Sequence, residues 1–463
     1  MPKSLAERLA ELTIQLRYED LPESVRRRAV DAVLDTLGCM LAGSRNESSQ
    51  SMYRYVRAVE AAPRSTVVGT DVRTAPALAA LANGTSSHSM ELDDTAEKAV
   101  LHPGVVVIPA AMAIAEIQGV SGADFLAAVV AGYEAVVRIG AATLGSQHPR
   151  GFHATGTTGP FGSAAAAGYL LRLNAEQQTN AFGLAGVNAS GLLEYKAGGD
   201  WSKRLQAGLA SEAGVVAAGL AREGYTGPRT IVEGRFGFFN GYANESEPSL
   251  VTEALGERWE IETVAIKPYA CCRFNHAPLD AILQIVRQHG VRADEVQKME
   301  VLVSDQTIRS VVWPQESRYR PQTVVDAQFS LPFCVARAVE AGRLSPAELT
   351  SESLTDERTL ALAARVEAKP DAVFTALYPD HNGCKITVHT PRGTFTAEVH
   401  NAKGEPEHPL TEAELAAKFE GLAAIAEIPA EPIIRAVRAL PTAPNLNDLF
   451  AALATREPAT AGR

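Results

Sequence analysis

The stretch from His88 to His102 is the densest set of side chains able to move protons. It reads HSMELDDT and ends in HPG, and its fifteen residues carry two imidazoles, four carboxylates and one lysine. Long Ala-rich apolar segments flank it. Burying charge is costly, and proteins tolerate that cost mainly where proton transfer or charged-ligand binding requires it. The stretch therefore predicts a catalytic or anion-binding site, with a helix-capping role for Asp93, Asp94 and Thr95 as the alternative.

Four other segments place polar groups on small-residue scaffolds. They are GFHATGTTG with His153, DWSKR with Lys203, KPYACCRFNH with Lys267, Arg273 and His276, and QFSLPF with Phe333. The first is predicted as a loop that opens an Ala-rich helix, whose free N–H groups suit a carboxylate or phosphate. It is not a dinucleotide-binding fingerprint. Each segment also has a purely structural interpretation: a hydrogen-bonded His153, a solvated helix start at Lys203 and Arg204, small apolar Cys271 and Cys272, and a core Phe333.

The elements that must position these groups are predicted to be helical up to about residue 260. Leucines recur at three- to four-residue spacing over residues 5–16, as on an amphipathic helix. A second helix is predicted from Pro22 to Gly43. Further Ala- and Gly-rich helices are predicted over 75–87, 104–118, 122–143, 160–172 and 204–222. The segment 105–114 is apolar on every face and should be buried, with Pro109 where its regular helix begins.

The pattern changes near residue 262. Strands are predicted over 298–303, 384–390 and 393–399, the last two as a hairpin, with helices over 276–289 and 327–341 among them. Helical periodicity returns over 411–425. The predicted fold is mainly α with an α+β part: a large all-α domain of residues 1–262 and 404–456, and a smaller α+β domain of residues 263–403.

Composition narrows the class of partner and compartment. The formal net charge of −11 argues against nucleic acid or an anionic membrane as the main partner. No window of ~18 apolar residues predicts a membrane span, and the N-terminus lacks a secretory signal pattern. The five cysteines fit no zinc-ligand spacing, so no metal is predicted and a reduced, cytoplasmic compartment is the simplest interpretation.

Taken together, these segments resemble the MmgE/PrpD family. The resemblance is carried, in family order, by LPESVRRRAVDAVLDTLGCMLAG, NGTSSHSMELDDT, HPGVVVIPAAMA, GFHATGTTGPFGSAAAAG, KRLQAGLASEAG, KPYACCRFNHAPLDA, AQFSLPF and HNAKGEPEHPLTEAELAAKF. It implies a helical domain with a smaller α+β lid domain, usually as a homodimer with the active site between the domains. It also implies proton transfer next to a carboxylate of a di- or tricarboxylate substrate, without metal or organic cofactor.

The resemblance implies roles for particular residues. His102 and His153 match the family's active-site histidines. Thr95 and Lys203 match polar substrate contacts, and Lys267 and His276 lie in the lid motif. From their chemistry, Lys203 is grouped with the catalytic residues, Asp93 is expected to orient or charge-tune an imidazole, and Arg273 to hold a substrate carboxylate in a bidentate pair.

The substrate and the bond broken are less constrained. Relative to the decarboxylases of the family, Glu91 stands for an aspartate, Cys272 for a histidine and Phe333 for a tyrosine. The leading hypothesis is therefore a dehydratase, similar to 2-methylcitrate dehydratase, acting on a hydroxy di- or tricarboxylate. The alternatives are an epimerase or isomerase, a cis-aconitate decarboxylase, and a non-catalytic protein that binds polycarboxylates. The choice of His102 as base or as acid stays open.

Overall fold

The computed structural model describes residues 2–454, which divide into two compact units. The helical unit consists of the residues up to Val264 together with those from Thr411 onward, and the α+β unit is Ala265–Leu410. Residues 404–410, predicted with the helical domain, belong to the α+β unit, because the Gly404 carbonyl accepts the Ile266 N–H at 2.9 Å. Residues 1 and 455–456 of the predicted domain lie outside the described residues.

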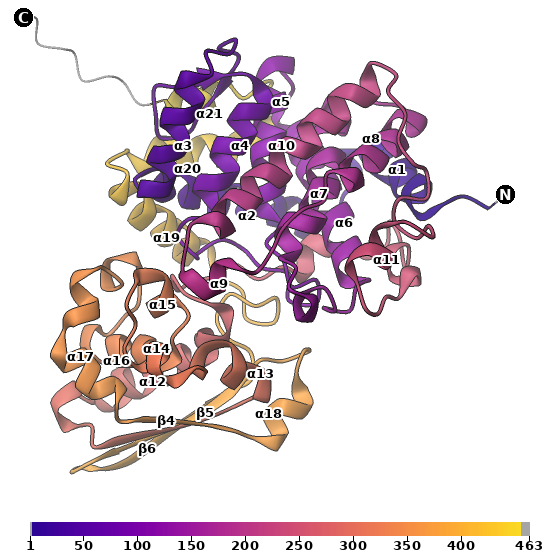
Figure 1. Cartoon of the computed structure of the whole chain (residues 1–463). Coiled ribbons are helices and arrows are strands. Elements are labelled where there is room, and N and C mark those ends of the chain that lie inside the picture. Colours follow the sequence, from indigo (N-terminus) through magenta and orange to yellow (C-terminus); the bar gives the residue numbers. More distant parts are fainter. Residues whose placement is uncertain (1, 455–463) are drawn as a thin grey trace, which may run out of the picture. The chain divides into compact units, whose positions relative to one another are not determined.

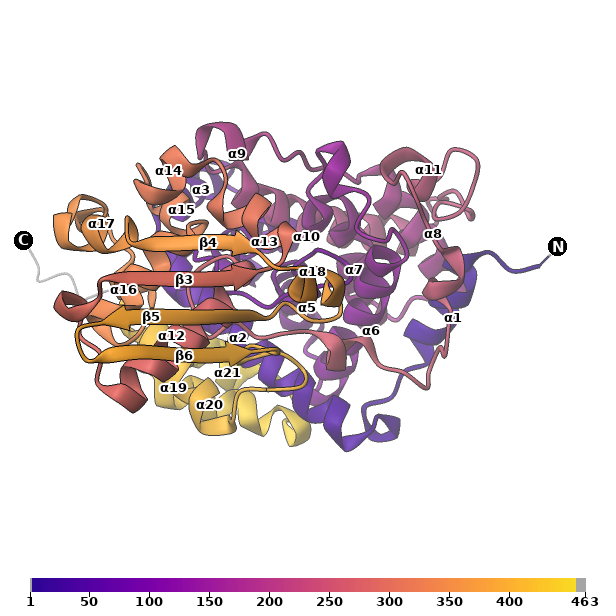
Figure 2. The same cartoon turned by 90° about the horizontal axis from the view of Figure 1, so that it is seen from below.

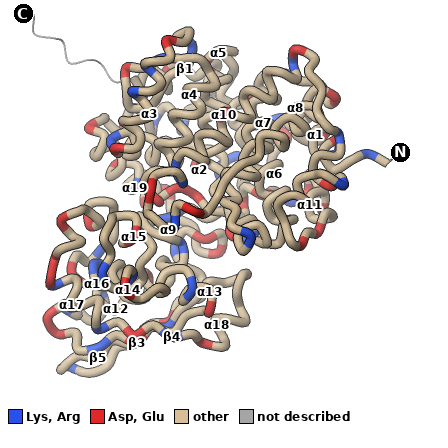
Figure 3. The backbone as a smooth tube through the Cα atoms, in the orientation of Figure 1, with Lys and Arg blue, Asp and Glu red and all other residues tan. Residues whose placement is uncertain are grey.

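The helical unit is a bundle of long helices (Figure 1). These are α1 (Leu5–Gln15), α2 (Glu23–Ser44), α3 (Glu47–Ala58), α4 (Pro76–Ser87), α5 (Gly104–Gln118), α6 (Gly122–Ala141), α7 (Ala154–Leu170), α8 (Ala175–Val187), α10 (Ser202–Arg222), α19 (Glu412–Ile425) and α20 (Ala430–Ala439). Two shorter helices are α11 (Phe238–Tyr242) and α21 (Asn447–Leu453). Within residues 2–454, none of the helices combines the length and apolar character that crossing a bilayer requires. Blue and red positions are interspersed along both units in Figure 3.

Helices α5 and α7 form the centre of the helical unit. Residues 104–115 of α5 and every residue of α7 are buried, as the all-round apolar segment 105–114 predicts. Small residues let the helices approach closely, since a Cβ at Gly84 on α4 would lie 2.9 Å from Cα of Gly208 on α10. The Ser163 hydroxyl of α7 donates to the Ala210 carbonyl of α10 at 2.6 Å. This dense packing makes a rigid support for side chains at the helix ends.

Three local predictions for this unit are wrong. Helix α5 begins at Gly104, because a carboxylate oxygen of Asp94 accepts the Gly104 N–H, so Pro109 lies inside the helix. Helix α7 begins at Ala154, because the His153 carbonyl already accepts N–H groups from the first turn, so most of the predicted Gly/Thr-rich loop is helical. The unit is also not entirely α, since β1 (Ser65–Thr66) and β2 (Arg73–Thr74) pair antiparallel.

The α+β unit is built on a four-stranded sheet in the order β4-β3-β5-β6 (Figure 2). Strand β3 (Lys298–Val303) pairs antiparallel with β5 (Cys384–Thr390), which forms a hairpin with β6 (Gly393–Val399). These three strands confirm the predicted ones. Strand β4 (Val366–Pro370) pairs parallel with β3 and was not predicted, because only Val366 of its five residues is buried and no alternation marks it.

Helices cover this sheet and carry the polar segments of the unit. Helix α12 (His276–His289) confirms the predicted helix and packs against α16 (Leu331–Ala341). The predicted helix 327–341 is divided, because Ser330 caps α16 and separates it from α15 (Val324–Gln328). The remaining helices are short: α13 (Asp305–Thr307), α14 (Gln315–Tyr319), α17 (Glu357–Ala363) and α18 (Ala372–Leu377).

Candidate active site

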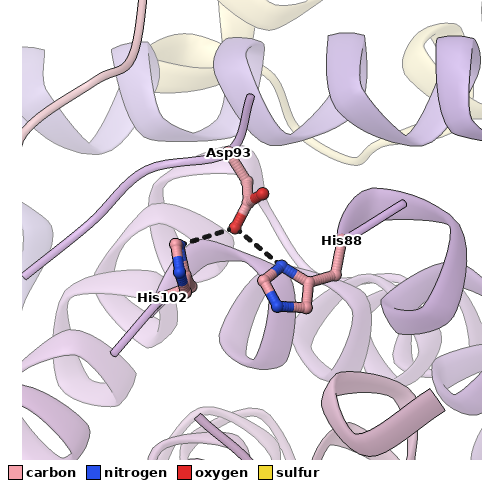
Figure 4. Close-up of side chains that lie close together, drawn as sticks. All are labelled: His88, Asp93 and His102. Carbon is pink, nitrogen blue, oxygen red and sulfur yellow. Dashed lines mark hydrogen bonds and ion pairs between the residues drawn. The ribbon is translucent and has the colours of Figure 1, made fainter. Parts of the chain in front are cut away.

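Asp93 holds two imidazole rings through one carboxylate oxygen (Figure 4). Its Oδ2 lies 3.0 Å from Nδ1 of His88 and 2.9 Å from Nδ1 of His102. The side chains of Asp93 and His88 are fully buried, whereas that of His102 is 14% exposed. We call His88, Asp93 and His102 the imidazole–carboxylate triad. Two predicted catalytic residues are thus in direct contact, and a third residue joins them.

The hydrogen bonds of the triad determine where each ring carries its proton. Nδ1 of His102 also lies 2.7 Å from the Asp94 carbonyl oxygen and 3.3 Å from the Thr95 hydroxyl. A carbonyl oxygen only accepts hydrogen bonds, so this Nδ1 must carry a hydrogen. In the neutral ring the lone pair is then on Nε2, and the same argument applies to His88, whose Nδ1 faces the carboxylate.

The triad lies on a strained segment between α4 and α5. His88 is the C-cap of α4, and the chain that follows contains two non-glycine residues, Glu91 and Val100, each with φ of 53°. Such left-handed backbone costs about 1–3 kcal/mol per residue and persists only where surrounding contacts enforce it. One of these contacts comes from α19, where the Lys418 ammonium donates to the Leu92 carbonyl at 2.8 Å. The late helix therefore fastens the segment that carries Asp93 and Thr95.

The side chain of Asp94, the residue after Asp93, makes hydrogen bonds that stabilise the fold. Its Oδ1 accepts the Gly104 N–H at 2.9 Å and its Oδ2 accepts the Tyr133 hydroxyl at 2.5 Å. Burial raises the pKa of the Asp94 carboxyl to about 7 against these hydrogen bonds, which lower it. The capping interpretation thus holds for Asp94, while Asp93 contacts imidazoles.

His153 lies at the N-cap of α7, with its ring stacked on that of His88 at 5.7 Å between centroids. Its Nδ1 is 2.9 Å from Oε1 of Gln206, and the amide nitrogen of Gln206 donates to the Leu192 carbonyl at 3.0 Å. The amide oxygen therefore accepts from His153 Nδ1–H, which leaves the lone pair on Nε2. Burial, followed by the charges of His88, Lys203 and His102, holds the pKa of His153 well below its usual value. His153 is a neutral imidazole that can accept a proton.

Lys203 and Arg204 are buried at the start of α10, so the solvated-helix interpretation is wrong for both. Lys203 forms an ion pair with Glu91. Arg204 instead contacts the start of α3, donating to the Asn46 side-chain oxygen at 2.8 Å and to the Ser48 hydroxyl at 3.0 Å. A buried ammonium that is close enough to His153 to lower the pKa of that ring can bind an anionic substrate group. Glu91 is the carboxylate paired with it.

The remaining predicted site residues belong to the α+β unit. Lys267 is 1% exposed, and His276 Nε2 lies 3.3 Å from the Cys271 carbonyl oxygen. Arg273 forms a buried ion pair with Glu405 of the same unit. Its predicted bidentate contact with a substrate carboxylate therefore stays a prediction, and Glu405 occupies part of the guanidinium. Phe333 and Cys271 are fully buried in the hydrophobic core of this unit, which confirms their structural interpretation.

The triad offers three ligand atoms that lie within 4.8 Å of one another, a spacing a metal ion could use. A metal bound through the atoms that face Asp93 would need the lone pair of His102 Nδ1. That nitrogen lies 2.7 Å from a backbone carbonyl oxygen, which requires a hydrogen on it. The donor set therefore fits hydrogen bonding to Asp93 better than metal ligation.

Sequence reasoning assigned no role to His88, Gln206 or Tyr195. His88 stood in the densest polar motif, which was a usable signal. Gln206 lies one helical turn after Lys203, but nothing in the sequence relates it to His153, 53 residues earlier. Tyr195, on the short helix α9 (Tyr195–Gly198), packs edge-on against the His153 ring at 5.6 Å. These contacts exist only through the tertiary fold.

Comparisons with known proteins cover almost the whole chain. The MmgE/PrpD N-terminal domain matches residues 7–251 and the MmgE/PrpD C-terminal domain matches residues 269–441. The "Cis-aconitate decarboxylase-like protein oryM" of Aspergillus oryzae is 28% identical over 461 residues, 94% of each chain. The cis-aconitate decarboxylase of Aspergillus terreus is 30% identical over 339 residues, 69% of each chain. The human cis-aconitate decarboxylase is 29% identical over 436 residues, 90% of this chain and 88% of its own.

Proposed function

Because this chain belongs to the MmgE/PrpD family, we propose that it is a lyase that breaks a bond next to a carboxylate of a small tricarboxylate. The observation that carries the proposal is the imidazole–carboxylate triad, with the neutral ring of His153 stacked on His88 and the buried Lys203 near enough to His153 to lower its pKa. This set supplies a base, an acid and a cation, which are the groups that proton transfer next to a carboxylate requires. The reaction needs no cofactor.

The geometry favours different roles for the two predicted histidines. His153 is the base, since its neutral ring has the lone pair on Nε2 and its low pKa keeps that nitrogen unprotonated. His102 is the acid, since an imidazolium there is stabilised by the Asp93 carboxylate and the Asp94 carbonyl. A lyase with this division of roles takes a proton on one ring and delivers a proton from the other.

The substrate carboxylates are bound by cations and hydroxyls in this proposal. In the helical unit Lys203 and Thr95 supply such groups, and the Glu91 carboxylate beside Lys203 limits how much negative charge the pair can take up. From the α+β unit we propose Lys267, Arg273 and His276 as further contacts. This assignment predicts a small polyanionic substrate.

Decarboxylation is the first candidate reaction, because the relatives above carry that activity in their names. In a decarboxylation of this kind the bond between carbon and a carboxylate breaks and carbon dioxide leaves. The electron pair stays on the carbon skeleton, where it takes a proton from His102. The two remaining carboxylates stay bound to the cations.

Dehydration is the second candidate and is favoured by two positions of the α+β unit. Phe333 takes the place of a tyrosine in the decarboxylases of the family. It is fully buried and cannot donate a proton. Cys272 stands where they have a histidine. In dehydration His153 takes a proton next to a carboxylate, the hydroxyl on the neighbouring carbon leaves, and His102 gives that hydroxyl its proton.

The test is incubation with a panel of hydroxy and unsaturated di- and tricarboxylates, followed by proton NMR in deuterium oxide. Loss of carbon dioxide with one deuteron gained supports decarboxylation, and loss of water supports dehydration. Proton exchange with neither product indicates an epimerase. Pretreatment with a metal chelator should leave the rate unchanged. Turnover that survives both His102→Ala and His153→Ala in full contradicts the proposed roles, and tight binding without turnover favours a non-catalytic protein.

We also propose a homodimer, with α10 as part of its interface. Leu209, Val216 and Leu220 recur at seven- and four-residue spacing on α10 and are 38–41% exposed, although the rest of this helix is largely buried. An apolar stripe of this kind commonly marks a protein–protein contact. Light scattering should give twice the mass of the chain, and Val216→Glu should shift the protein toward monomer.

A further inference from the structure

His88 lies between the two histidines to which the proposed function gives roles. Its ring centroid is 4.7 Å from that of His102 and 5.7 Å from that of His153, and it is parallel to the latter within 13°. Its side chain is fully buried, and its Nδ1 donates to Asp93 Oδ2 at 3.0 Å. His88 thus contacts both rings and the carboxylate.

The second ring nitrogen of His88 has no hydrogen-bond partner among the described residues. As the acceptor nitrogen of a neutral ring, it loses only a weak interaction in this position. A protonated His88 would have an N–H there with no acceptor, in a site without access to water, which costs far more. The position of His88 therefore suits it to act as a donor to Asp93.

His102 differs from His88 in the two respects that decide which ring holds a proton. It is partly exposed, and its Nδ1 has a second acceptor in the Asp94 carbonyl, so its imidazolium is better solvated than that of His88. Both rings, however, donate to the same oxygen of Asp93. The hydrogen bond from His88 reduces the negative charge that Asp93 presents to His102, so Asp93 stabilises the protonated form of His102 less strongly.

We infer that His88 is a positioning residue. Its hydrogen bond to Asp93 Oδ2 orients the carboxylate and reduces the negative charge that faces His102. His102 can then release its proton to the substrate. The inference rests on the proposed function. His88 touches no substrate in this scheme and acts only through Asp93. Without it, Asp93 would hold the His102 imidazolium too firmly for an efficient acid.

The charged and titratable surroundings of the three rings are otherwise largely paired. Glu91 pairs with Lys203, Asp35 of α2 pairs with Lys418 of α19, and Asp94 accepts the Tyr133 hydroxyl of α6. Cys39 of α2 is a neutral thiol, because burial raises its pKa well above the usual value. Arg204 is directed to α3. Changing His88 should therefore alter chiefly the balance between Asp93 and His102.

Two variants separate positioning from a structural role. His88→Leu removes the donor, and we expect kcat to fall about 10- to 100-fold with KM within about twofold. The alkaline limb of the kcat profile should move up by about one pH unit, because Asp93 then acts on His102 alone. His88→Asn keeps a side-chain N–H in reach of Asp93, so kcat should stay within about threefold of the original protein and the profile should not move.

A double-mutant cycle tests whether His88 acts through Asp93. In the Asp93→Asn background, His88→Leu should change kcat by less than about twofold, because the shared oxygen has lost its charge. Equal losses of kcat in His88→Leu and His88→Asn, or a full additional loss in the Asp93→Asn background, overturn the inference. If His88→Leu fails to fold, His88→Asn and the Asp93 background still decide.

Ring-nitrogen NMR of nitrogen-15 histidine gives a readout that needs no turnover. The His102 signal, assigned by its loss in His102→Asn, should titrate at higher pH in His88→Leu and unchanged in His88→Asn, with exposed His400→Leu as the control variant. If no polycarboxylate is turned over but this shift occurs, the inference stands and the proposed function fails. If turnover occurs and the His102 titration is the same in all variants, the proposed function stands and the inference fails.

Discussion

Two buried carboxylates of the helical unit, Asp93 and Glu134, have opposite kinds of partner. In the triad, Asp93 is held by imidazoles. Glu134 on α6, in contrast, pairs with the guanidinium of Arg138, one turn later on the same helix. All of these side chains except that of His102 are fully buried. The contrast separates a buried charge that supports the fold from one that is placed for chemistry.

The Glu134–Arg138 cluster has its hydrogen bonds filled by rigid partners. Glu134 accepts from Arg138 Nε at 2.7 Å and from the Glu260 backbone N–H at 2.6 Å. The other two guanidinium nitrogens donate to the carbonyls of Glu253 at 2.7 Å and Arg258 at 2.6 Å. The contacts with residues 253, 258 and 260 tie α6 to the segment before residue 264. Arginine does not lose its proton in this range. Burial raises the pKa of the Glu134 carboxyl to about 7, but the hydrogen-bond partners of this carboxyl are a guanidinium and a backbone N–H.

The triad uses groups that can change their proton count. Imidazole is the side chain whose ordinary pKa lies near neutrality, and three such rings meet here. One ring nitrogen, that of His88, is left without a partner among the described residues. A buried ionic cluster with every donor used therefore indicates structure, whereas imidazoles around a carboxylate indicate function. Changes in the two clusters should separate activity from stability.

The largest expected effect is on catalysis, from His102→Asn. Asparagine keeps a donor near the Nδ1 position but has no nitrogen in place of Nε2, so the acid is lost. We expect kcat to fall about 10²- to 10⁴-fold, the usual contribution of a positioned acid or base. The urea midpoint should change little, because His102 is the most exposed member of the triad. Steady-state kinetics and urea denaturation measure the two effects. A large loss of stability with normal kcat would place His102 with the structural residues.

The second effect falls on stability, from Arg138→Met. Removal of the guanidinium leaves the buried Glu134 without its charged partner and two backbone carbonyls without their donors, which should lower the free energy of unfolding by about 3–5 kcal/mol. The folded protein should retain its kcat, since Arg138 does not contact the triad. The double variant Glu134→Leu/Arg138→Met should recover part of the loss. A kcat that falls with Arg138→Met at full folding would remove the distinction between the clusters.

Asp93, Thr95 and His102 could be found from the sequence because they lie within a stretch of ten residues and contact one another locally. Helix α1 followed from its leucine spacing, α2 from the proline and glycine near its ends, and the β5–β6 hairpin from its β-branched runs. His153 and Lys203 required the family resemblance, because nothing local relates them to the triad.

The contacts that define the chemistry were beyond sequence reasoning. The Glu91–Lys203 pair spans 112 residues, and the Arg273–Glu405 pair spans 132. The start of α7 depended on hydrogen bonds that the His153 carbonyl accepts rather than on composition. The Glu134–Arg138 spacing is that of an ordinary surface pair, and only the tertiary fold buries it.

A third expected effect is a pH dependence of stability that originates at Asp94. Burial raises its folded pKa to about 7, above the usual carboxyl value, so the folded state binds the proton more tightly than the unfolded state. Its contribution is present at low pH and is lost as pH rises from about 4 to about 7, with a slope of about 1 kcal/mol per pH unit. Urea denaturation across this range should show a weaker dependence in Asp94→Asn. An equal slope in both proteins would contradict the raised pKa.

The smallest expected effect is on stability, from loss of the hydrogen bond between the Tyr133 hydroxyl and the Asp94 carboxylate. Tyr133→Phe removes the hydroxyl that donates to Asp94 Oδ2, which should cost about 1–2 kcal/mol of stability where Asp94 is ionised. The loss should grow as pH rises through about 7, because the hydroxyl stabilises the carboxylate more than the acid. Tyr169→Phe is the matched control, since its hydroxyl donates to the uncharged Leu16 carbonyl at 2.9 Å and its loss should not vary over this range. Parallel pH curves for the two variants would show that Asp94 stays protonated throughout, and would leave Asp93 as the single ionised carboxylate of its pair.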